Sequence, residues 1–113
     1  MNLKKQQIAI AQACGWTYSN KHPIYGRQSF KLWHYKDTEI IAYHWTKLPN
    51  YLHDLNAMHE AERILDGYMM LKYASELLAV IGGGSGCFSH IHATAAQRSE
   101  AFLRTLGKWE ESK

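Results

Sequence analysis

The sequence predicts an α+β fold in which a small antiparallel or mixed three-stranded sheet lies between helices. Segments with apolar residues at helical spacing begin and end the chain, and two aromatic, β-branched segments follow each other near residue 36. Both faces of these strands carry apolar side chains, so the sheet needs cover on both sides. The expected order is α-β-β-α-α-β-α in a single domain over residues 1–113, because this length supports one hydrophobic core.

The first helix is expected over residues 3–14. Ile8, Ala11 and Cys14 recur at helical spacing, and Gly15 follows as a stop signal. Residues 17–27 contain serine, asparagine, proline and glycine in close succession, and this composition predicts a loop.

A β-hairpin is expected next, with strands at 28–35 and 39–45. Alternation along the first strand places Phe30 and Leu32 on one face, and Trp33 and Tyr35 on the other.

Two helices are expected after the hairpin, over residues 54–65 and 68–81, with Asp54 as the N-cap of the first. Asp66 and Gly67 are expected to interrupt the helical pattern between them. The acidic cluster of Glu60, Glu62 and Asp66 is typical of a solvated helix surface. The glycine-rich segment 82–86 predicts a loop, and residues 87–92 predict a third short strand.

The last helix carries the clearest local signal in the chain. Thr94 and Gln97 match the capping box, in which each side chain bonds the backbone N–H of the other residue. The helix is expected to run to about residue 106, where Gly107 ends it. Its predicted buried stripe consists of Ala95, Ser99, Phe102 and Leu106.

Charge is distributed unevenly along the chain, although the formal net charge is only +3. The first 36 residues hold six basic residues and no acid, whereas the remainder holds seven basic residues and ten acids. Aromatic residues are interleaved with these bases, a combination suited to pairing with phosphate and stacking on a base. The same residue types also build a packed core with a solvated lysine face, and the sequence leaves both readings open.

Two segments resemble the phage ABA-sandwich domain family, a group of small tailed-phage and prophage proteins. They are residues 49–65 (PNYLHDLNAMHEAERIL) and 91–111 (IHATAAQRSEAFLRTLGKWEE), which together form about a third of the chain. The resemblance implies a sandwich of helix, sheet and helix, and a phage or prophage origin. Ser99 stands where alanine is commoner in the family. The resemblance implies no reaction and brings no catalytic residues.

The leading functional hypothesis is a non-enzymatic binding protein that a phage uses against a host defence. It would sequester a small anionic, nucleotide-type signal or block a host protein, without a cofactor. Cations would neutralise phosphate while aromatic rings stack on the base. The candidate ligand-binding residues are Arg27, Lys31, Trp33, Tyr35, Lys36 and Trp45.

Two alternatives come from other functional classes. A metal-dependent or histidine-dependent enzyme acting on nucleotides or nucleic acid would use His44, His90 and His92, of which the last two project from one face of a strand. A DNA-binding accessory protein would use the cationic first third of the chain.

Composition also bears on location and assembly. No window approaches 18 consecutive apolar residues, so no membrane segment is expected, and the host cytoplasm is the predicted location. The two cysteines cannot form a disulfide framework. Fourteen aromatic residues exceed what a small sheet covers, which predicts a homo-oligomer, most simply a dimer, with Trp33, Tyr35 and Trp45 near the interface or the ligand pocket.

Overall fold

The computed structural model of this chain describes residues 1–22, 26–36, 38–82 and 93–111, and it confirms the α+β class. Helix α1 spans Leu3–Ala13, and the strands β1, β2 and β3 span Trp16–His22, Gly26–Tyr35 and Ile41–Ala42. A short 3-10 helix, η1, spans Trp45–Lys47. Helices α2, α3 and α5 span Leu55–Glu62, Gly67–Val80 and Ala95–Thr105.

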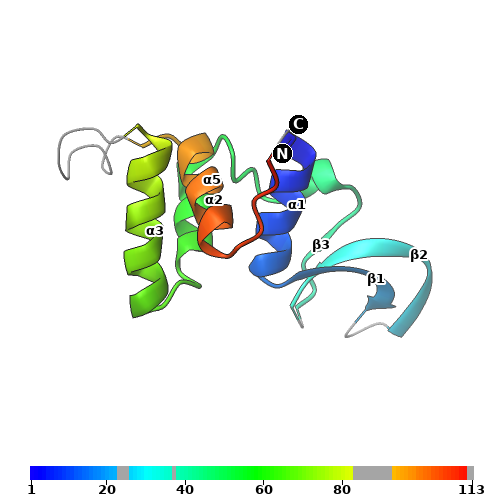
Figure 1. The fold of residues 1–113 in the computed structure, drawn as a ribbon. Helices are drawn as coiled ribbons and strands as arrows, with labels where there is room; N and C mark the ends of the chain where they lie inside the picture. Colours follow the sequence, from blue (N-terminus) through cyan, green and yellow to red (C-terminus); the bar gives the residue numbers. More distant parts are fainter. Residues whose placement is uncertain (23–25, 37, 83–92, 112–113) are drawn as a thin grey trace.

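The sheet lies at one end of an elongated molecule of 52 × 32 × 22 Å (Figure 1). Helix α1 packs against β1, α5 packs between α1 and α3, and α3 is the outermost helix. The described helices therefore lie to one side of the sheet rather than on both sides of it. The strand predicted at 87–92 lies outside the described residues, and so does most of the glycine-rich segment.

Strand β2 is central, and it pairs antiparallel with both β1 and β3. The loop predicted for 17–27 is wrong over residues 17–22, which form most of β1, and over residues 26–27, which begin β2. Pairing with β2, with Trp16 opposite Tyr35 and Tyr18 opposite Trp33, overrides the weak strand propensity of the polar residues in this segment.

The strand predicted at 39–45 is also shorter than expected, since only Ile41–Ala42 pairs with β2. The His44 side chain accepts a hydrogen bond from the backbone N–H of Thr46 and thereby caps η1. This local bond starts a helical turn where the aromatic composition predicts extended chain.

The predicted helix starts are confirmed where a capping side chain marks them. Asp54 accepts from the N–H of Asn56 at 2.9 Å, and Thr94 and Gln97 form the full capping box that begins α5. Asp66, predicted to interrupt a helix, instead caps α3 by accepting from the N–H of Met69 at 3.1 Å. Local hydrogen bonds of this kind satisfy backbone donors that the first turn leaves unpaired.

The core is centred on α5. The predicted stripe of Ala95, Ser99 and Phe102 is buried, and Leu106 is half-buried. Ala101 and Leu103, on other faces of the helix, are also completely buried. Three helices surround α5, which explains why its burial extends beyond one stripe.

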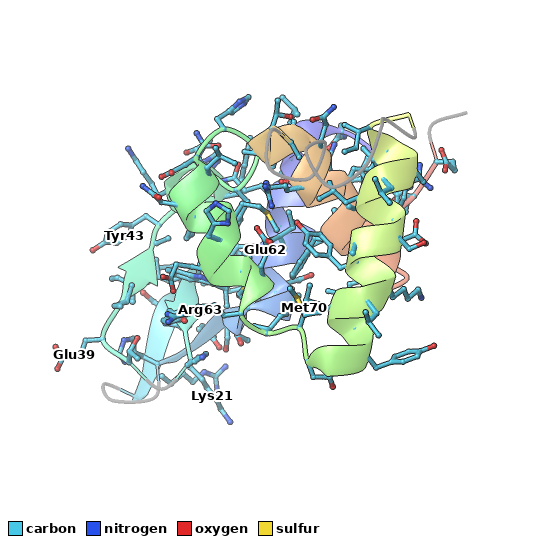
Figure 2. All side chains as sticks on the ribbon, turned by 90° about the vertical axis from the view of Figure 1, so that its left-hand side faces the viewer. Lys21, Glu39, Tyr43, Glu62, Arg63 and Met70 are labelled. Carbon is cyan, nitrogen blue, oxygen red and sulfur yellow. The ribbon has the colours of Figure 1, made fainter. Side chains whose placement is uncertain are left out.

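One carboxylate of the predicted solvated surface on α2 is in fact largely buried. Glu62 (Figure 2) is 13% exposed and lies 3.5 Å from Arg98 of α5, which is 12% exposed. His59 Nδ1 lies 3.1 Å from the other Glu62 oxygen. The Tyr73 hydroxyl lies beside this pair, where burial and the nearby Glu62 charge raise its pKa. Glu60, two residues earlier, is exposed. The spacing of the two glutamates in the sequence therefore did not show that one is buried and the other exposed.

Candidate functional site

A pocket of about 350 Å³ lies where α1, the β1–β2 hairpin and η1 meet. We call it the α1–hairpin pocket. Its lining residues come from all three elements and from the turn after β3: Lys4, Ile8, Tyr18, Trp33, Tyr43, His44 and Trp45. A pocket of this size lined by aromatic rings and a few polar groups is typical of a small-molecule site.

Two lysines place positive charge at this pocket, because Lys4 lines it and Lys31 contacts the lining residue Tyr18. Lys4 Nζ lies 5.9 Å from the ring centroid of Trp45, and Lys31 Nζ lies 5.9 Å from the ring centroid of Tyr18. Each ammonium group therefore lies over an aromatic face, where the ring quadrupole attracts it. No carboxylate is among the described residues that line the pocket, so an anion meets attraction without opposing repulsion.

Contacts with neighbouring side chains and with helix α1 hold the aromatic rings of the pocket in place. Tyr18 and Trp33 lie opposite each other across the β1–β2 ladder, with ring centroids 5.0 Å apart. Gln7 of α1 donates from its side-chain amide to the carbonyl oxygens of Trp45 and Leu48, at 3.3 and 3.1 Å. These bonds fasten η1 to α1, and they fix the position of Trp45.

His44 adds a further polar group to the pocket. Its Nδ1 accepts from the backbone N–H of Thr46 and lies 2.9 Å from the Thr46 hydroxyl. Because Nδ1 is the acceptor, the proton of the neutral ring is placed on Nε2. His44 can therefore donate a hydrogen bond to a ligand that carries oxygen atoms.

Three of the six ligand-binding residues predicted from the sequence gather around this pocket. Trp33 and Trp45 line it, although Trp33 is only 6% exposed. Lys31 does not line the pocket itself, but its Nζ lies over the ring of Tyr18, which does.

The structure places the other three elsewhere. Tyr35 and Lys36 lie at the open end of the hairpin, outside this pocket. There the Lys36 backbone N–H donates to the Gly15 carbonyl, and the Lys36 Nζ lies 5.3 Å from the Tyr35 ring. Arg27 lies near the start of β2, opposite Lys21. The predicted set is therefore not a single site.

Several pocket residues were not predicted as ligand contacts from the sequence, namely Lys4, Ile8, Tyr18, Tyr43 and His44. One signal was available, because Lys4 and Ile8 lie four residues apart and so share a face of the predicted first helix. Tyr18 could not be found, because the segment that contains it was predicted to be a loop.

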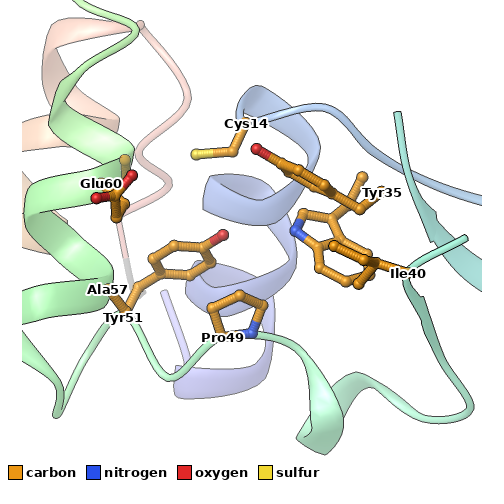
Figure 3. A pocket seen from close by; sticks show the side chains of 9 residues that line it. Cys14, Tyr35, Ile40, Pro49, Tyr51, Ala57 and Glu60 are labelled. Carbon is orange, nitrogen blue, oxygen red and sulfur yellow. The ribbon is translucent and has the colours of Figure 1, made fainter. Parts of the chain in front are cut away.

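A second pocket of about 260 Å³ lies between α1, the sheet and α2 (Figure 3). Its walls are mainly apolar, and they include Tyr35, Ile40, Pro49 and Ala57. Its carboxylate, Glu60, lies 3.2 Å from Arg63 in an exposed ion pair.

The polar atoms in the wall of the second pocket bond to one another. The Tyr51 hydroxyl donates to the thiol of Cys14 and accepts from the indole N–H of Trp16. Burial raises the pKa of the Cys14 thiol and of the Tyr51 hydroxyl, so both stay neutral at physiological pH. A neutral thiol is a poor nucleophile, and the carboxylate that lines this pocket, Glu60, is exposed and paired with Arg63.

The structure describes only one of the three histidines named for the alternative enzyme function. His44 lies in the α1–hairpin pocket, whereas His90 and His92 lie outside the described residues. Within residues 1–22, 26–36, 38–82 and 93–111, no three histidine, cysteine or acidic side chains are grouped as a metal site requires.

Comparison of the chain with protein-family models, with curated proteins and with solved structures finds no match. In the part of the chain that the structure describes, no helix combines the length and the apolar character needed to cross a bilayer.

Proposed function

We propose that this chain is a non-enzymatic binding protein, and that the α1–hairpin pocket takes a nucleotide-type ligand. One observation carries the proposal: two lysine ammonium groups lie over aromatic rings at a pocket without a carboxylate among its described lining residues. Lys4 and Lys31 would pair with phosphate, while Tyr43 or Trp45 would stack on the base. The His44 Nε2–H would donate to an oxygen of the ligand.

The resemblance of residues 49–65 and 91–111 to the phage ABA-sandwich family supplies the biological setting of this proposal. The protein would be encoded by a phage or prophage and would act in the host cytoplasm, where it sequesters a nucleotide signal of a host defence. A chain that blocks a host protein instead would bind no nucleotide.

Tyr43→Ala tests the pocket with little risk to the fold, since Tyr43 is 70% exposed. Isothermal titration calorimetry with linear and cyclic nucleotides should detect binding to the parent protein and weaker binding as salt rises. Loss of one stacked ring should weaken that binding about ten- to a hundredfold, because stacking contributes about 1–3 kcal/mol per base.

Tyr68→Ala is the matched control, because Tyr68 is 78% exposed on α3 and lies outside the pocket. It should leave the nucleotide affinity unchanged. No heat with any nucleotide of the panel would exclude the small-molecule function and leave a protein target as the remaining version. Equal losses in both variants would mean that the α1–hairpin pocket is not the site.

Assembly as a dimer is part of this proposal, and the surface that supports it lies away from Trp33 and Trp45, which line the α1–hairpin pocket. Trp33 is buried, and Tyr35 and Trp45 are half-buried, within one chain. The exposed apolar side chains of α3 include Tyr68 and Leu71, exposed by 78% and 73%.

Light scattering at micromolar concentration should therefore give a mass of twice the 13.0 kDa of one chain, and Leu71→Glu should reduce this mass to that of one chain. A parent protein of one-chain mass would contradict the dimer.

A further inference from the structure

The far end of the hairpin carries two cations that face each other. Lys21 of β1 lies directly opposite Arg27 of β2 in the ladder, and both side chains are exposed. Like charges at directly opposite positions of an antiparallel pair destabilise it. The hairpin keeps this pair close to the point where the two strands are joined.

Arg27 differs from the other arginines in its surroundings. Arg63, Arg98 and Arg104 each contact a glutamate, at 3.2, 3.5 and 3.0 Å. Neither Arg27 nor Lys21 has a carboxylate within ion-pair distance among the residues that the structure describes. The first 36 residues contain no acid at all, so no partner is available from the hairpin itself.

A third cation connects this end of the hairpin with the α1–hairpin pocket. Lys31, on β2 between Arg27 and the pocket residue Trp33, is exposed and lies over the ring of Tyr18. Six residues of strand span at most about 22 Å, so the three cations and the pocket lie within the reach of a few linked nucleotides.

We propose that the ligand is a single-stranded nucleic acid, with one base in the α1–hairpin pocket and the adjoining phosphates along Lys31, Arg27 and Lys21. This inference rests on the proposed function, because it extends the same pocket. The polyanion would relieve the repulsion between Lys21 and Arg27 when it binds. A single strand fits better than a duplex, because only an unstacked base can enter an aromatic pocket.

The test compares a ten-nucleotide single strand, as RNA and as DNA, with the mononucleotide of the same base. The variant is Lys21→Gln combined with Arg27→Gln. Its matched control is Lys72→Gln combined with Lys108→Gln, which removes the same charge from exposed positions outside the hairpin. Fluorescence anisotropy measures the strand affinity over a salt series, and calorimetry measures the mononucleotide affinity.

The parent protein should bind the strand at least tenfold more tightly than the mononucleotide. The hairpin variant should lose that gain, and its slope of log affinity against log salt should fall by about 1.4, which is two phosphate contacts at about 0.7 each. Its mononucleotide affinity should stay unchanged, and the control should match the parent in both measurements. A preference for RNA or for DNA would identify the type of strand.

Three results would overturn the inference. They are a strand affinity no higher than the mononucleotide affinity, a strand affinity unchanged in the hairpin variant, and tighter binding of a duplex of the same sequence. In each of these cases, intact mononucleotide binding would leave the proposed function standing. Absence of binding to both the strand and the mononucleotide would overturn the proposed function itself.

Discussion

Phe102→Ala should lower the free energy of unfolding by about 3–5 kcal/mol, as large-to-small substitutions of buried aromatic residues do. Phe102 lies at the centre of α5 with no exposed surface, among helices α1, α2 and α3. Removing its ring deletes buried apolar area and leaves a cavity that helices packed on several sides cannot close. A domain of this size has about 5–15 kcal/mol of stability, so the loss is a large share of the total.

Urea unfolding followed by tryptophan fluorescence measures this loss. Phe30→Ala provides the matched control, because Phe30 undergoes the same chemical change on β2 while 55% exposed. The control should change the free energy of unfolding by less than about 1 kcal/mol. Similar effects of the two substitutions would contradict the central position of α5 in the core.

Glu62→Gln should cost about 2–3 kcal/mol, because it leaves the largely buried guanidinium of Arg98 without its counter-charge. The glutamine side chain keeps the size of glutamate, so a cavity does not contribute. The neutral amide also loses the charge-assisted contact with His59. The expected effect therefore reports the ion pair between α2 and α5.

The control for this ion pair lies on the same helix. Glu60 pairs with Arg63 at 3.2 Å, but both side chains are more than 70% exposed. Water screens this exposed pair, so Glu60→Gln should cost less than about 0.5 kcal/mol. Thermal or urea unfolding of the two variants under the same conditions measures both losses of stability. Equal costs would mean that the burial of Glu62 adds nothing to its pairing.

Much of the helical structure could be predicted from sequence because its signals are local. The capping box of Thr94 with Gln97 and the cap at Asp54 each involve residues two or three positions apart, and both are present. Strand β1 could not be predicted in the same way. Its polar residues become a strand only through pairing with β2, a contact that no short window of sequence contains.

The candidate site was predicted only in part, for the same physical reason. The cationic, aromatic character of the first third was evident from composition, and Lys31, Trp33 and Trp45 do gather at one pocket. Tyr35, Lys36 and Arg27 share that composition but lie elsewhere on the hairpin. Composition records which side chains are present, whereas strand register decides which of them meet.

The sequence by itself determined the α+β class, the helix starts and the acid-free charge of the first 36 residues. These properties depend on residue type and on hydrogen bonds between near neighbours in the chain. Only the tertiary structure decided that Glu62 is buried while Glu60 is not, and that Lys4 and Tyr18 line one pocket. Burial and cross-strand pairing depend on residues distant in sequence, and their contacts arise only when the whole chain packs.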